Sequence, residues 1–211
     1  MFLSIIVSFF GIVGIFIFLP VILSTGDLFI GVVFLFQVIR AVAVLVLLAA
    51  VICVLAPISI PVPTAAASVT LATFAVYLAT SALSPLQSFL SVMIYILLGC
   101  AGLPVFSNFT GGAGVIAGPT GGYIIGYICC ALAGGLLIQK FSYKFFVYPL
   151  ALVLGTALCY VCGTLWFISL TGKGLAAALT MCVIPFIPLD IIKIIVAAPV
   201  GFRLRKALGQ L

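Results

Sequence analysis

Charge is scarce in this sequence, and that scarcity constrains the fold more than any other feature. Ten of the 211 residues are charged, eight basic and two acidic, whereas hydrophobic residues make up 67%. A water-soluble domain carries charge at roughly a quarter of its positions, so most of this surface must face something other than water. Lipid meets that requirement, since about 20 apolar residues cross one bilayer core. The sequence therefore predicts an all-α integral membrane protein.

Turns rich in proline, glycine and polar residues divide the chain into apolar segments. We expect six of these to form a transmembrane bundle over residues 40–211: 41–56, 69–83, 86–101, 120–138, 147–170 and 175–202. Residues 1–39 form an N-terminal hydrophobic extension. Its first segment, 2–23, lacks both the charged start and the small-residue cleavage site of a signal peptide, which favours an additional uncleaved helix.

The basic residues test this threading, because cytoplasmic loops of membrane proteins are enriched in Lys and Arg. If Arg40 is cytoplasmic, six alternating spans place the charges that follow the fourth and sixth spans on the same side: Lys140, Lys144, Arg203, Arg205 and Lys206. Among the basic residues that lie between spans, Lys173 alone is placed on the outer side of the membrane. The sequence therefore predicts a multi-pass protein of the cytoplasmic membrane with a cytoplasmic C-terminus.

Two other classes of function are disfavoured by the same composition. The net charge of +6 arises from dispersed topology markers and forms no basic patch, so we expect no nucleic-acid binding. The chain has seven cysteines and no histidine, a composition that disfavours a metal-binding site. We interpret the Cys159-x-x-Cys162 motif as small apolar residues within a helix.

A glycine-rich stretch, 102–119, is long for a connector and lies on the outer face in this threading. We expect it to be non-helical. It is not a phosphate-binding loop, because the chain contains no GxxxxGK[ST] pattern. Its glycines allow the backbone to approach a ligand closely, and irregular backbone at membrane depth is tolerated where it lines a cavity.

Asp190 and Lys193 form the second candidate site, within the apolar run that opens the last span. Proline is favoured in a first helical turn, so this helix is expected to start near Pro188, with Asp190 in its first turn. Lys193 lies three residues on and shares the same face. Ionisable residues in a membrane mark functional sites by default. A self-satisfied structural ion pair is the alternative, and it would add little over apolar packing.

The motifs and their order resemble the signature of the BioY family, the biotin-binding S-components of energy-coupling-factor (ECF) transporters. The resemblance covers roughly Arg40 to the C-terminus. It is carried by Gly102-Leu103-Pro104-Val105-Phe106, Gly118-Pro119-Thr120-Gly121-Gly122-Tyr123 and Pro185-Phe186-Ile187-Pro188-Leu189-Asp190-Ile191-Ile192-Lys193.

This resemblance implies a six-helix fold that binds one biotin near the outer face, beneath the loop between the third and fourth helices. It implies that Asp190 and Lys193 hold the ureido ring. Other pocket or tail contacts would come from the glycine loop and the following helices: Asn108, Gly112, Gly114, Thr120, Tyr123, Tyr160 and Trp166.

The sequence thus predicts biotin uptake without a cofactor or an enzymatic step. Since the chain lacks an ATP-binding motif, any ATP drive must come from ECF coupling and ATPase subunits; alternatively the protein works alone or as a homo-oligomer. Transport of another vitamin, such as thiamine or riboflavin, is an alternative on the same fold. A membrane enzyme with Asp190 as general base is a weaker one, because no histidine and few other groups could assist it.

Overall fold

The computed structural model describes residues 28–60, 68–141 and 144–209. Two compact units divide at Leu47/Leu48, and each is described by itself. The elements in chain order are α2 (Leu28–Leu55), β1 (Ser59–Ile60), β2 (Val69–Thr70), α3 (Ala72–Ala82), α4 (Pro85–Cys100), a 3-10 turn (Ser107–Phe109), α5 (Ala113–Ala117), α6 (Gly121–Lys140), α7 (Val147–Thr171), α8 (Leu175–Cys182) and α9 (Ile187–Ala207).

The expected succession of apolar helices is confirmed. Among the described residues, α2, α6 and α7 are long and apolar enough to cross a membrane. Helices α8 and α9 meet the same criterion only when taken together, as a broken span or a re-entrant loop, with a bend of 49° between them. The remaining two segments, α3 and α4, are shorter apolar helices. The segment predicted as 69–83 is helical only from Ala72, because Val69 and Thr70 pair with Ile60 and Ser59 in a two-stranded antiparallel hairpin.

The first compact unit contributes only the beginning of α2 to the described residues. This helix passes through Gln37 and Arg40 without a break and exposes large apolar side chains such as Phe36 and Ile39. The predicted helix over 2–23 lies outside the described residues. The predicted domain boundary at residue 40 falls inside α2, and that division stays a prediction.

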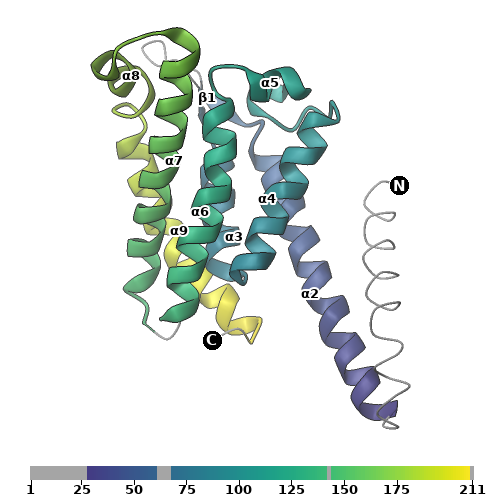
Figure 1. Ribbon diagram of the computed structural model, residues 1–211. Coiled ribbons are helices and arrows are strands. Elements are labelled where there is room, and N and C mark those ends of the chain that lie inside the picture. Colours follow the sequence, from purple (N-terminus) through teal and green to yellow (C-terminus); the bar gives the residue numbers. More distant parts are fainter. Residues whose placement is uncertain (1–27, 61–67, 142–143, 210–211) are drawn as a thin grey trace. The chain divides into compact units, whose positions relative to one another are not determined.

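Helices α6 and α7 lie side by side in the second unit (Figure 1), and glycine makes this possible. A Cβ at Gly126 of α6 would lie 3.0 Å from the Cα of Cys159, and one at Gly155 of α7 would lie 3.2 Å from the Cα of Cys130. Both distances are shorter than ordinary van der Waals contact. Each helix thus offers a glycine against the other's backbone, which fixes how the α6 and α7 side chains face the interior.

Helices α3 and α9 form a second close pair. Gly201 of α9 leaves room for Ser81 of α3, whose side chain any Cβ at that position would overlap. The Arg205 guanidinium, buried at 2% exposure, donates a hydrogen bond of 2.9 Å to the carbonyl of Leu83 at the end of α3. A terminal carbonyl of a helix lacks an intrahelical partner, so Arg205 satisfies it and fastens the two helices at this end.

The glycine-rich stretch is not wholly irregular, so the expectation of a non-helical loop is wrong in part. It contains the 3-10 turn and the five-residue helix α5, which follows Gly112 with its φ of 99°. Positive φ is accessible to glycine at little cost. Turns of this size need few residues and no strong periodicity, which explains why the sequence pattern did not reveal them.

Figure 1 shows that α5 and the α7–α8 connection lie at one end of the second unit, and that the last residues of α6 and α9 lie at the other. The basic residues near that far end are Lys140, Lys144, Arg203, Arg205 and Lys206. Lys173, in the α7–α8 connection, lies at the α5 end. Within the second unit, the basic residues that were expected on one side therefore lie at one end, and Arg205 among them is buried.

Candidate functional site

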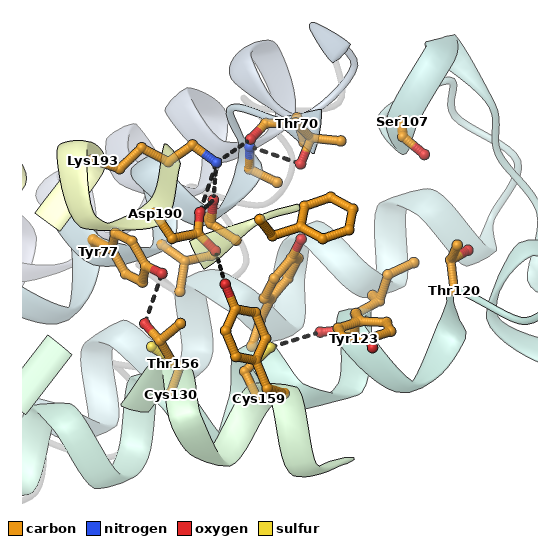
Figure 2. Close-up of a pocket in the computed structure, with 18 of the residues that line it drawn as sticks. Thr70, Tyr77, Ser107, Thr120, Tyr123, Cys130, Thr156, Cys159, Asp190 and Lys193 are labelled. Atoms are coloured by element: carbon orange, nitrogen blue, oxygen red, sulfur yellow. Dashed lines mark hydrogen bonds and ion pairs between the residues drawn. The ribbon is translucent and has the colours of Figure 1, made fainter. Parts of the chain in front are cut away.

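A pocket, called the central pocket below, opens within the second unit between α3, α6, α7 and α9. Figure 2 shows 18 of its residues. Its lining is largely apolar and aromatic with a limited set of polar groups, as is typical of small-molecule sites. The lining residues are Ala56, Ser68, Thr70, Ala72, Thr73, Val76, Tyr77, Tyr95, Ser107, Thr120, Tyr123, Ile124, Tyr127, Cys130, Thr156, Cys159, Tyr160, Cys182, Phe186, Asp190 and Lys193.

Helix α9 brings Asp190 and Lys193 into this pocket. The helix begins at Ile187 with proline in its first turn and Asp190 in that same turn, one residue from the predicted start. An acidic side chain there meets the positive end of the helix dipole. The Lys193 Nζ lies 2.8 Å from Asp190 Oδ1, and the two side chains are only 11% and 5% exposed. The predicted geometry of the pair is confirmed.

Donors from α3 and α7 complete the environment of the Asp190 carboxylate. Its Oδ1 accepts hydrogen bonds from Lys193 and, at 3.2 Å, from the Thr73 hydroxyl. Its Oδ2 accepts a 2.6 Å hydrogen bond from the Tyr160 phenol. A carboxylate has about four lone-pair positions, so three donors leave room for one more at Oδ2.

The Lys193 ammonium is equally well surrounded. Besides Asp190, it donates to the Thr70 carbonyl at 2.9 Å and to the Thr73 hydroxyl at 2.7 Å. Its three N–H donors therefore all meet oxygen atoms. Thr73 accepts from Lys193 and donates to Asp190, which makes α3 the structural partner of both charges. This closed network keeps two ions stable at low exposure.

Tyrosine forms a large part of the pocket lining. Five of the chain's seven tyrosines contribute to the lining: Tyr77, Tyr95, Tyr123, Tyr127 and Tyr160. The hydroxyl of Tyr77 is hydrogen-bonded to Thr156 at 2.7 Å, and that of Tyr123 donates to the Cys182 carbonyl at 3.3 Å. Such partners let an aromatic ring remain buried while its polar atom stays satisfied.

The pocket has a second polar region away from the ion pair. In Figure 2, Asp190, Lys193 and Tyr77 lie at one side and Ser107, Thr120 and Tyr123 at the other, with aromatic side chains between them. Ser107 belongs to the 3-10 turn within the glycine-rich stretch, and Thr120 directly follows that stretch. This arrangement suits a ligand that carries a hydrogen-bonding head and a polar tail joined by an apolar segment.

The structure brings Asp190, Lys193, Thr120, Tyr123 and Tyr160 of the predicted site residues together at this pocket. The others do not line it. Gly114 is an exposed residue of α5, and a Cβ built at Gly112 or Gly114 meets no atom within 4 Å.

Asn108 and Trp166, also expected at the ligand, instead hold the glycine-rich stretch in place. The Asn108 side chain accepts a hydrogen bond from the Ser59 hydroxyl at 2.6 Å and donates to the Ser68 hydroxyl at 3.2 Å. Ser59 belongs to β1, and Ser68 directly precedes β2. The Trp166 indole N–H donates to the Gly118 carbonyl at 3.0 Å. The polar side-chain groups of both residues are thus engaged by the protein itself, outside the pocket lining.

Sequence reasoning did not assign roles to Thr70, Thr73, Tyr77 or Tyr127. A usable signal was present in α3, where Thr73 and Tyr77 are four residues apart and hence on one face of a short apolar helix. The two thiols of the CxxC motif have different neighbours. Cys159 lines the pocket and donates to the Tyr123 carbonyl, whereas the Cys162 Sγ lies 3.8 Å from that of Cys129.

Comparison with known proteins gives a consistent set of matches. The model of the BioY family matches residues 30–210. The biotin transporter BioY of Thermotoga maritima is 39% identical over 133 residues, covering 63% of this chain and 78% of that protein. The biotin transporter BioY2 of Lactococcus lactis is 33% identical over 162 residues, covering 77% of this chain and 88% of that protein.

A solved structure matches as well. The crystal structure of the S-component for biotin from an ECF-type ABC transporter superposes with a TM-score of 0.76 at 26% sequence identity. The match covers 81% of this chain and 93% of that one. It therefore includes most of the helices that build the central pocket.

Proposed function

Because this chain belongs to the BioY family, we propose that it takes up biotin, by capture at the outer face of the cytoplasmic membrane and release inside. The observation that carries the proposal is the division of the central pocket into two polar regions with aromatic side chains between them. Biotin has the same division: a ureido head, an apolar bicycle and chain, and a carboxylate tail.

The ion pair suits the ureido head. A ureido group offers two N–H donors and one carbonyl acceptor, and Asp190 Oδ2 has a free lone-pair position beside Tyr160. Lys193 donates to the ureido carbonyl once it gives up its hydrogen bond to either Thr70 or Thr73. Hydrogen bonds to charged groups contribute about 1.5–3 kcal/mol each, so this end supplies much of the affinity.

The opposite region suits the tail. Ser107 and Thr120 supply hydroxyl groups there, and Tyr123 supplies an aromatic face. The glycine-rich stretch, which contributes Ser107 to this side of the pocket, is held by the Asn108 and Trp166 hydrogen bonds. Both residues thus act on biotin indirectly, through the position of the stretch.

The distribution of basic residues supports an orientation in the membrane. In this proposal the end with Lys140, Lys144 and Arg203 is cytoplasmic and the α5 end is outside, in keeping with the positive-inside rule. Asp190 lies 13 residues before Arg203 in α9, which is about 20 Å along a helix. The ligand head is therefore held in the outer half of the membrane.

Two energy sources are compatible with this function. The protein serves either as the S-component that ECF coupling and ATPase subunits drive, or as a solitary transporter, alone or as a homo-oligomer. Purification from native membrane distinguishes these two modes, because ATPase and coupling subunits co-purify only with an S-component.

The contacts of Asp190 favour transport over catalysis. Its carboxylate accepts hydrogen bonds from three donors, which disfavours a role as general base.

Uptake of radiolabelled biotin tests the function itself. We expect cells that lack other biotin uptake to accumulate label when they express this chain, with the coupling subunits supplied in one arm and omitted in the other. The Asp190→Asn variant should abolish accumulation. Label that stays at background in both arms, with the protein present in the membrane, would refute biotin uptake.

A further inference from the structure

The α5 end of the second unit is poor in charge. The sequence has no Asp, Glu, Lys or Arg between Arg40 and Lys140, nor between Lys144 and Lys173. The charged residues of the second unit that belong to the α5 half are therefore Lys173, Asp190 and Lys193. Since Asp190 and Lys193 neutralise each other at 2.8 Å, Lys173 contributes the net charge there.

Lys173 occupies a defined position in the α7–α8 connection. Gly172, with a φ of 66°, ends α7 in the left-handed conformation, and Gly174 precedes the first residue of α8. The exposed Lys173 side chain folds back, with its Nζ 3.5 Å from the Met181 Sδ and 6.0 Å from the Phe167 ring centre. Among the described residues no carboxylate forms a salt bridge with it.

Lys173 lies against side chains that pack on the outer side of the pocket lining. Phe167 and Cys182 are buried in one hydrophobic cluster, against which Tyr123 and Met181 pack. Tyr123 and Cys182 also line the central pocket on their other side. One layer of side chains therefore separates the Lys173 ammonium from the region of Thr120 and Tyr123, the region proposed for the ligand tail.

We propose that Lys173 makes the protein selective for an anionic ligand end, by attracting the carboxylate tail of biotin as it enters. This inference rests on the proposed function and adds to it the residue that distinguishes a charged from a neutral tail. A cation near a pocket mouth of low polarity raises the local concentration of an anion and its association rate. For unit charges about 5–10 Å apart in water, the attraction corresponds to about a two- to fourfold effect.

The test compares biotin with biotinamide, whose tail is a neutral carboxamide, in association kinetics with the purified protein. Lys173→Met removes the charge and keeps an apolar stem against Phe167 and Met181. At low ionic strength we expect it to slow biotin association about two- to fourfold and to leave biotinamide unchanged. The deficit should shrink in high salt, because screening removes the attraction. Lys173→Arg should retain the wild-type preference.

Lys206→Met serves as the matched control, because Lys206 is an exposed lysine at the opposite end of the unit. An equal loss for both ligands in Lys173→Met would assign Lys173 to packing and overturn the inference, as would unchanged biotin association. Wild-type protein that binds neither ligand would overturn the proposed function and this inference together. Wild-type binding with no charge preference would overturn the inference alone.

Discussion

The ion pair in the central pocket allows a quantitative test of how two charges are kept at low exposure. In Lys193→Met, the Asp190 carboxylate stays buried, with Thr73 and Tyr160 as its remaining donors. Loss of one partner of a buried ion pair costs about 3–5 kcal/mol, because the other charge is left uncompensated. For a chain of this size 1 kcal/mol corresponds to about 2–4 °C, so we expect the unfolding midpoint to fall by about 6–20 °C.

Removal of both charges should cost less than removal of one. In the double variant Asp190→Asn with Lys193→Met, the introduced amide is nearly the same shape as the carboxylate and still accepts from Thr73 or Tyr160, and no ion is left unpaired. We therefore expect a midpoint above that of Lys193→Met. Large departures from additivity are expected for residues in direct contact.

Thermal unfolding of detergent-purified protein measures these midpoints, with a thiol-reactive dye as reporter. Cys130, Cys159 and Cys182 are buried and become reactive only on unfolding. Lys206→Met, which replaces an exposed lysine of the same helix, is the control and should shift the midpoint by no more than about 2 °C. The reasoning is refuted if Lys193→Met behaves like that control, or if the double variant falls by the sum of the single losses.

Three further sets of substitutions test the site and the packing around it. Tyr160→Phe removes a 2.6 Å hydrogen bond to Asp190 and should lower ligand-free stability by about 1.5–3 kcal/mol; biotin should narrow this deficit in thermal unfolding, because its N–H group takes the vacated position. Gly126→Ala should reduce the yield of folded protein by forcing α6 from α7, whereas Gly114→Ala, with open space around it, should leave both yield and biotin affinity unchanged. Asn108 has a φ of 56°, so Asn108→Ala should be less stable than Asn108→Gly by about 1 kcal/mol, and equal midpoints would contradict that reasoning.

The helical architecture was accessible from the sequence because it depends on composition and chain order. Apolar length marks each helix, and the distribution of Lys and Arg sets the alternation, so six apolar segments after Arg40 could be counted. The short elements were not accessible. The β1–β2 hairpin and α5 arise from backbone contacts over a few residues, such as the pairing of Ser59 with Thr70, and produce no periodic pattern.

The Asp190–Lys193 pair was predictable because both residues lie on one turn of one helix. Its partners were not, since Thr73 and Tyr160 are 117 and 30 residues away from Asp190 and lie on helices that are apolar on several faces. Nothing in an apolar helix's own sequence says which face meets the pocket. Asn108 and Trp166 show the converse: the family resemblance placed both at the ligand, yet the protein's own serines and backbone engage their polar atoms.

The most direct test of the account is equilibrium titration of the purified protein with biotin, thiamine and riboflavin, each against wild type and Asp190→Asn. We expect the wild-type protein to bind biotin alone, with saturation, and the variant to lose at least about 1.5–3 kcal/mol of binding free energy, roughly 10- to 150-fold in Kd. Binding of biotin with the same Kd in both proteins would contradict the assignment of the central pocket. Wild-type binding of thiamine or riboflavin in place of biotin would contradict the proposed function.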